Sequence, residues 1–128
     1  MKNHRLHTER RQHQRYRVQK NAFALLRNES IYPGQITEIS LGGIVFQYTS
    51  KNGSSPEASE IDIISANYTE AVLIRHLDIK KVSDLAVSEK KADGSAQLRK
   101  QVVRFGNLSR GQMSRLKHFI RGYSSCCV

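Results

Sequence analysis

Most of the chain alternates short apolar segments with polar turns, a pattern typical of strands. Residues 22–27 are apolar, and turn-forming residues follow at 28–30 and at Pro33-Gly34, which predicts a strand, a turn and a second strand. From Gln35 to Tyr48 apolar residues recur mainly at every second position, and Gly42-Gly43 interrupts them. We therefore expect two strands that meet at a tight corner, where the glycines adopt positive φ.

The same pattern continues toward the C-terminus. Residues 51–59 are rich in Ser and Gly and predict a loop. Strand-like runs follow at 61–64, 71–79, 82–87 and 98–105, with a polar turn at 90–95. Because no helical period separates these runs, the chain is expected to be mainly β, with an antiparallel sheet that curls into a barrel.

The last element has a helical period. Ser109 and Gln112 have the spacing of a capping box, in which each side chain satisfies the other's backbone amide. One apolar face follows, made by Met113, Leu116, Phe119 and Ile120, and Gly122 is placed to end the helix. This predicts an amphipathic helix of roughly three turns over about 109–121 that covers or plugs the barrel.

The length of 128 residues suits one compact domain. The formal charge of +10 is uneven, because residues 1–20 hold seven Lys and Arg side chains against Glu9 alone and have little apolar periodicity. We therefore expect a flexible basic arm over 1–20, a folded domain over 21–123 and a disordered tail over 124–128. An arm of this kind favours an anion bound at one place.

The sequence offers little for catalysis or metal binding. His4, His7 and His13 lie in the arm without a carboxylate or Cys cluster, and Cys126 and Cys127 are adjacent near the end, so we expect free thiols and no metal site. Nucleophile and base arrangements and phosphate loops are also missing, which favours a protein that is not an enzyme and has no cofactor. Neither a membrane-spanning segment nor a secretory signal is visible, so a cytoplasmic location is expected.

Two short motifs carry the candidate chemistry. Arg11 and Arg15 form an Arg-x-x-x-Arg run directly after Arg10, and guanidinium groups can fork onto phosphate oxygens or onto the O6 and N7 atoms of guanine. Downstream, a Glu-x-Ser-x-x-Gly element supplies an acceptor, a hydroxyl and a residue without a side chain: Glu38, Ser40 and Gly43. Alone, the second motif is an ordinary hairpin in which Ser and Gly serve the turn. With the arginine run upstream, we interpret the pair as a binding site for a guanine nucleotide.

In order and spacing these motifs resemble the PilZ domain, a bacterial receptor module for cyclic di-GMP. The resemblance begins at Glu9, continues through Ile36–Phe46, and resumes at Val102–Ser109, while residues 50–98 match in pattern alone. It implies a six-stranded antiparallel split barrel with a C-terminal helix. It also implies that Arg11 and Arg15 contact phosphate and guanine, that Glu38, Ser40 and Gly43 surround a base, and that Arg10 influences whether one ligand or a stacked pair binds.

One departure from the family pattern keeps alternatives open. The family has Asp or Asn where this chain has Glu38, which is one methylene longer than Asp and has more rotamer entropy to lose. The leading hypothesis is a sensor of cyclic di-GMP that signals to a protein effector. The alternatives are a PilZ-fold adaptor that acts by protein contacts alone, in motility or pilus assembly, and a nonspecific nucleic-acid-binding module. A monomer or weak homodimer is expected in each case.

Overall fold

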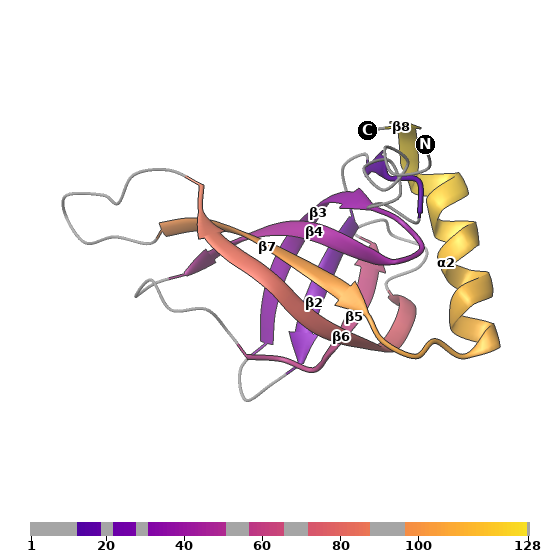
Figure 1. Ribbon diagram of the computed structural model, residues 1–128, viewed down its shortest axis with the longest axis horizontal. Coiled ribbons are helices and arrows are strands. Elements are labelled where there is room, and N and C mark those ends of the chain that lie inside the picture. Colours follow the sequence, from indigo (N-terminus) through magenta and orange to yellow (C-terminus); the bar gives the residue numbers. More distant parts are fainter. Residues whose placement is uncertain are drawn as a thin grey trace, which may run out of the picture.

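The computed structural model describes residues 13–18, 22–27, 31–50, 57–65, 72–87 and 97–127 (Figure 1). Strands dominate these ranges, and one long helix lies near the C-terminus. The elements in chain order are β1 (Tyr16–Val18), β2 (Ala22–Arg27), β3 (Ile31–Ile39), β4 (Gly43–Ser50), β5 (Glu60–Ser65), β6 (Val72–Ala86), β7 (Gln97–Phe105), α2 (Arg110–Tyr123) and β8 (Ser124–Cys127).

Six of the strands close into a barrel. Neighbours follow the order β2, β5, β6, β7, β4 and β3, and β3 then returns to β2 through pairs such as Phe23 with Gln35 and Leu25 with Pro33. Each of these pairings is antiparallel. The expected six-stranded antiparallel barrel with a C-terminal helix is therefore confirmed (Figure 1).

The chain ends form a small extension of the sheet beside β3. β1 pairs with the last residues of β3, so that Tyr16 lies opposite Ile39 and Arg17 opposite Glu38. β8 pairs with the other edge of β1. The predicted disordered tail is thus wrong for residues 124–127, and the end of the predicted flexible arm is a strand. Neither strand could be predicted from the local pattern, because two short strands become stable here only by pairing with each other and with β3.

The interior is filled by the apolar positions of alternate residues, as the period of two predicts. Phe46, Ile61 and Leu77 are fully buried, and α2 covers one end of the barrel with Leu116, Phe119 and Ile120. The buried apolar side chains are Ala22, Ala24, Leu26, Ile36, Ile39, Ile44, Val45, Phe46, Tyr48, Ile61, Ile63, Ile74, Leu77, Ile79, Val103, Phe105, Leu116, Phe119 and Ile120.

The helix begins as predicted and ends later. Ser109 Oγ accepts from the Gln112 amide at 3.0 Å, and the Ser109 amide donates to Gln112 Oε1 at 2.9 Å, which confirms the capping box. Gly122 does not stop the helix, which continues to Tyr123. The stop comes at Ser124, whose backbone is extended and whose amide and hydroxyl both bond to the Ile120 carbonyl, so a glycine is not needed.

The predicted turn at Pro33-Gly34 is wrong, because both residues lie inside β3. Pro33 precedes the stretch of β3 that pairs with β4, which begins at Gln35, and a strand tolerates proline best where one edge is unpaired. Gly34 is required by packing, since a Cβ there would overlap the ring of Phe46. A glycine that makes room for an aromatic ring looks, in sequence, like a turn residue.

The strands predicted at 71–79 and 82–87 form a single strand, β6. Three register shifts occur along β6 in place of the expected break. Two lie in the pairing with β5, and one lies in the pairing with β7 at Val82, where Lys81 lies opposite Val103 but Ser83 opposite Val102. His76, near the first shift, has a φ of 55°. A β-bulge bends a strand without ending it, and its extra residue disturbs the alternation that marks a continuous strand in sequence.

Candidate functional site

A groove of about 790 Å³ opens beside the β3–β4 turn. Its walls come from the residues before β1, from the turn itself, from β6 and β7, and from the start of α2. The lining residues are His13, Arg15, Glu38–Val45, Val82, Val102–Leu108 and Met113. Four of the six predicted site residues, Arg15, Glu38, Ser40 and Gly43, therefore border one cavity.

Arg15 reaches the groove because β1 pairs with β3. The register that sets Arg17 opposite Glu38 brings Arg15 Nη1 to 3.9 Å from Glu38 Oε1. The two side chains are 41% and 28% exposed, so solvent screens this ion pair and the contact is weak. A guanidinium held this loosely keeps most of its donors available to an anion in the groove.

Ser40 organises the turn. Its Oγ accepts from the amides of Gly42 and Gly43 at 3.0 and 3.2 Å, and its own amide donates to the Gly43 carbonyl at 2.9 Å. Both hydroxyl lone pairs are thereby used, which leaves the O–H as the group that Ser40 can offer a ligand. The turn geometry anticipated for this Ser is present, whichever ligand the groove takes.

Close approach of the backbone requires one of the two glycines of the turn, Gly43. A Cβ on Gly43 would overlap the carbonyl oxygen of Val103, so the β4 and β7 backbones could not come this near. A Cβ on Gly42 would lie 2.8 Å from the His13 ring. Neither glycine adopts a positive φ, so that part of the prediction is wrong. The requirement comes from a neighbouring strand, which sequence does not reveal.

Arg10 and Arg11 lie outside the described residues, and their part in the site stays a prediction. Gln12 is not described either, so the described part of the chain begins at His13, two residues after Arg11. His13 itself borders the groove.

The structure adds a cation that sequence reasoning missed. Arg104 is exposed on β7, lies opposite Gly43 in register and lines the groove. Its outward direction could be predicted, because its neighbours Val103 and Phe105 carry the apolar period. Its position across from Gly43 could not, because it depends on the pairing of β4 with β7. Arg104 and Arg15 give the groove two guanidinium groups, with Glu38 as an acceptor.

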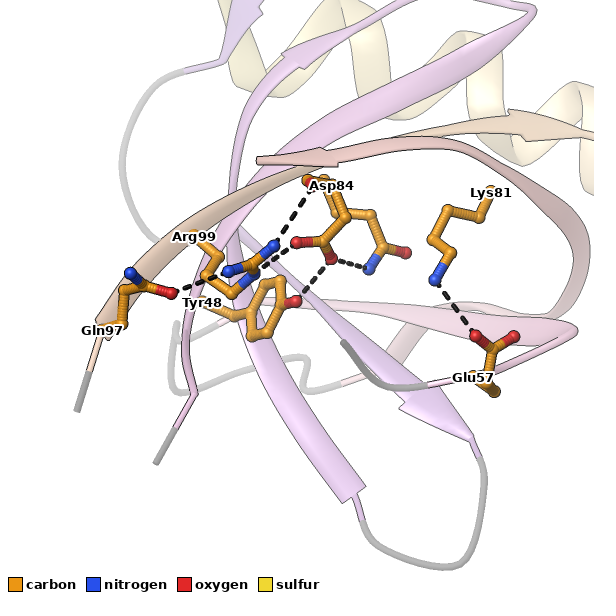
Figure 2. A network of polar contacts seen from close by, with 7 residues as sticks. Tyr48, Glu57, Lys81, Asp84, Gln97 and Arg99 are labelled. Carbon is orange, nitrogen blue, oxygen red and sulfur yellow. Dashed lines mark hydrogen bonds and ion pairs between the residues drawn. The ribbon is translucent and has the colours of Figure 1, made fainter. Parts of the chain in front are cut away.

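A second polar cluster lies at the other end of β4, inside the barrel (Figure 2). Asp84 accepts from Arg99 Nε at 2.5 Å, from Gln101 Nε2 at 2.7 Å and from the Tyr48 hydroxyl, and Arg99 also donates to Gln97. The carboxylate is 5% exposed. Because the Asp84 carboxylate accepts from side chains of β4 and β7, the cluster ties β4, β6 and β7 together.

The hydrogen bond to Asp84 raises the pKa of Arg99 above its usual value, against the opposing effect of burial. A raised folded-state pKa stabilises the fold fully below the unfolded-state pKa, and this stabilisation is lost only as the pH rises through the folded-state value. For an arginine that window lies far above neutral pH. Across the physiological pH range Arg99 therefore stays charged, and the cluster contributes the same stabilisation throughout.

The described residues hold no group of three or more His, Cys, Asp or Glu side chains placed to bind a metal ion. Within the same ranges no helix is long and apolar enough to cross a membrane.

No family model matches the sequence, and no curated protein matches it. Solved structures do resemble the fold. The PilZ domain with c-di-GMP of YcgR from Escherichia coli superimposes with a TM-score of 0.68 at 16% identity, over 89% of this chain and 91% of that one. The MrkH–c-di-GMP complex from K. pneumonia gives 0.60 at 16% identity, over 87% and 51%. YcgR in complex with c-di-GMP, also from E. coli, gives 0.60 at 18% identity, over 88% and 45%.

These similarities establish that the chain has the PilZ fold. It spans nearly all of the isolated YcgR domain and about half of the longer MrkH and YcgR chains.

Proposed function

We propose that this chain, a domain of the PilZ fold, is a receptor that binds cyclic di-GMP in the groove beside the β3–β4 turn and does not catalyse a reaction. The observation that carries the proposal is the pairing of β1 with β3, which brings Arg15 to the same groove as Glu38 and Ser40. Solved structures with this fold, from YcgR and MrkH, contain c-di-GMP. The groove volume of about 790 Å³ lies within the range of small-molecule sites.

Each side chain has a chemical role in the proposal. Arg15 and Arg104 donate to phosphate oxygens or to guanine O6 and N7, and Arg11 and Arg10 add further donors from the segment upstream. Glu38 accepts from the donors on the Watson–Crick edge of guanine, and Ser40 donates its O–H. Gly43 keeps the turn close to β7, so that the base approaches backbone instead of a side chain.

The extra methylene of Glu38 does not prevent this role. Glu38 is 28% exposed and its contact with Arg15 is 3.9 Å long, so its carboxylate can turn toward a base without losing a strong partner. The added rotamer entropy lowers affinity by less than the acceptor contributes.

The receptor is proposed to act in the cytoplasm and to signal to a protein effector. A dianion bound between Arg15 and the β3–β4 turn would stabilise the β1–β3 pairing and with it the order of the segment upstream. The effector would recognise that ordered state.

Isothermal titration calorimetry with cyclic di-GMP tests the proposal. Arg15→Ala and Arg104→Ala are each expected to weaken binding about tenfold or more, because each removes charge-assisted hydrogen bonds. Arg115→Ala, which removes an exposed arginine of α2 outside the groove, is the matched control and should leave affinity unchanged. Cyclic di-AMP should bind poorly, since adenine lacks the adjacent N1–H and N2–H donors of guanine from which Glu38 would accept hydrogen bonds. Absence of heat from a folded wild-type protein at tens of micromolar would reject the proposal.

A second candidate is an adaptor of the same fold that binds no nucleotide. The observation that favours it is that the turn explains both Ser40, through its two amide bonds, and Gly43, through its contact with Val103. Under this alternative, a purified protein effector binds wild-type protein and Arg15→Ala equally, with or without cyclic di-GMP.

A further inference from the structure

Exposed apolar side chains concentrate on one part of the molecule. Among the described residues, the large apolar side chains left exposed are Val82 (58%), Leu85 (65%), Val87 (43%) and Leu98 (37%). All four belong to β6 and β7 or directly follow β6. Singly scattered apolar residues on a surface need no explanation, but four gathered on one pair of strands do.

The strand register places three of them on a single outward face. Leu85 follows the buried Asp84 side chain and lies opposite the exposed Lys100, and the Val87 amide donates to the Leu98 carbonyl at 2.9 Å. Because side chains alternate along a strand, the exposed Leu85, Val87 and Leu98 share the outward face. Val82 is the extra residue of the β6 bulge, and it borders the groove together with Val102 of β7. Val102 lies on the same face of β7 as Lys100, two residues away. The apolar strip therefore runs along the hairpin to the edge of the groove.

Cations flank this strip. Lys80 and Arg104 lie opposite each other in register, and Lys100 lies two positions before Val102 on β7. The side chains of these three cations are exposed. Between residues 80 and 87 and between 98 and 104 the one carboxylate is Asp84, whose side chain is buried on the inner face. We call the four apolar residues and three cations together the hairpin face.

The hairpin face is held in shape from within. The inner side of the same strands carries the hydrogen-bonded cluster in which Asp84 accepts from Arg99, Gln101 and Tyr48 (Figure 2). A surface already ordered loses little side-chain and backbone entropy when a partner binds. This distinguishes it from an apolar patch on a mobile loop.

We propose that the hairpin face is a docking surface for an acidic segment of a partner protein, in which Asp or Glu side chains are interspersed with apolar ones. The apolar strip supplies buried area, and Lys80, Lys100 and Arg104 supply complementary charge and orientation. Because Val82 and Arg104 border the groove as well, the docked segment would lie at its rim.

Other occupants fit less well. A second copy in a symmetric dimer would place the three cations near their own equivalents, which costs energy. Nucleic acid would find no aromatic side chain among these residues on which to stack a base. A membrane surface is usually met by Trp, Tyr or Phe, and the hairpin face has none.

The test is a titration of the ¹⁵N-labelled full chain, without nucleotide, with a short synthetic peptide of equal numbers of Glu and Leu. Amide shifts are expected at residues 80–87 and 98–104. A peptide with Lys for Glu and another with Ser for Leu should each bind about tenfold more weakly. Two double variants of the protein should each lower its affinity for the Glu–Leu peptide by about the same factor: Leu85→Ser/Leu98→Ser and Lys80→Glu/Lys100→Glu.

The matched control is Lys117→Glu/Arg121→Glu, the same charge change on exposed positions of α2, which should leave peptide affinity unchanged. Arg15→Ala should also leave it unchanged, so failure of docking and failure of nucleotide binding are separate results. Equal binding of the basic peptide, shifts confined to other faces, preferential binding of an oligonucleotide or of anionic vesicles, or self-association abolished by Leu85→Ser/Leu98→Ser would each overturn the proposal.

Discussion

At the scale of single residues, several positions in the candidate site have a role in the fold that is independent of any ligand. Ser40 closes the turn through its hydroxyl, and Gly43 lets β4 and β7 approach. A motif residue of this kind is informative about the fold even where the nucleotide is not bound. Arg15 and Arg104 differ, because Arg104 is exposed and Arg15 is partly exposed, in a loose contact with Glu38.

The two kinds of glycine give a direct test. Gly43→Ala is expected to lower the free energy of unfolding by about 1–3 kcal/mol, since its Cβ meets the Val103 carbonyl. Gly122→Ala is the matched control in α2, where nothing lies within 4 Å of the added Cβ, and should stabilise the protein by up to about 1 kcal/mol. Urea unfolding of both variants measures the difference, and equal effects would contradict the close approach of β4 and β7.

At the scale of elements, α2 is fixed to the barrel at its first turn as well as by its apolar face. Gln112 completes the capping box, and its Nε2 donates to the carbonyls of Arg75 and His76 at 2.9 Å each. These carbonyls are exposed at the β6 irregularity, where His76 has its φ of 55°. One side chain thus connects the start of the helix with a bulge that could not be located in sequence.

Gln112→Ala is therefore expected to cost more than the loss of a cap. It removes the bond to Ser109 and both bonds to β6, and should lower the free energy of unfolding by about 1–2 kcal/mol. Ser114→Ala, an exposed change two residues further along α2, should be neutral or slightly stabilising because Ala is the better helix former. Thermal and urea unfolding would show this difference, and a neutral Gln112→Ala would argue against the link to β6.

At the scale of the whole molecule, the dominant features are closure and charge. A closed barrel leaves each of its six strands paired on both edges over part of its length, and β1 and β8 then extend the sheet at β3. The formal charge of +10 on 128 residues adds repulsion that the fold has to overcome. The hairpin face and the groove both lie on this positive molecule, which suits the acidic partner segment and the nucleotide proposed for them.

Salt should consequently stabilise the free protein. Raising NaCl from about 0.05 to about 0.5 M shortens the screening length and weakens the repulsion, so the melting temperature should rise by about 2–5 °C. The same salt should weaken cyclic di-GMP binding, because it screens the attraction between the arginines and the phosphates. Differential scanning calorimetry measures the first effect. A melting temperature that falls with NaCl would show that favourable ion pairs outweigh the net charge.

The amino-acid sequence by itself determined what depends on near neighbours. The period of two fixed the mainly β class and the inward positions, and the Ser109–Gln112 capping box fixed the start of α2, because the groups that interact are a few residues apart. The two motifs also identified four residues that the fold brings to one groove. Arg10 and Arg11, beyond the described residues, stay predictions.

Tertiary structure alone decided what depends on which strands become neighbours. The register of β4 against β7 placed Arg104 opposite Gly43. The pairing of β1 with β3 and β8 formed strands from residues expected to be an arm and a tail. The Phe46 ring occupies the space that a side chain at Gly34 would need, so this glycine lies within a strand and not in a turn. Each contact joins residues far apart in the chain. Its free energy depends on the closed barrel as a whole, so no local pattern in the sequence records it.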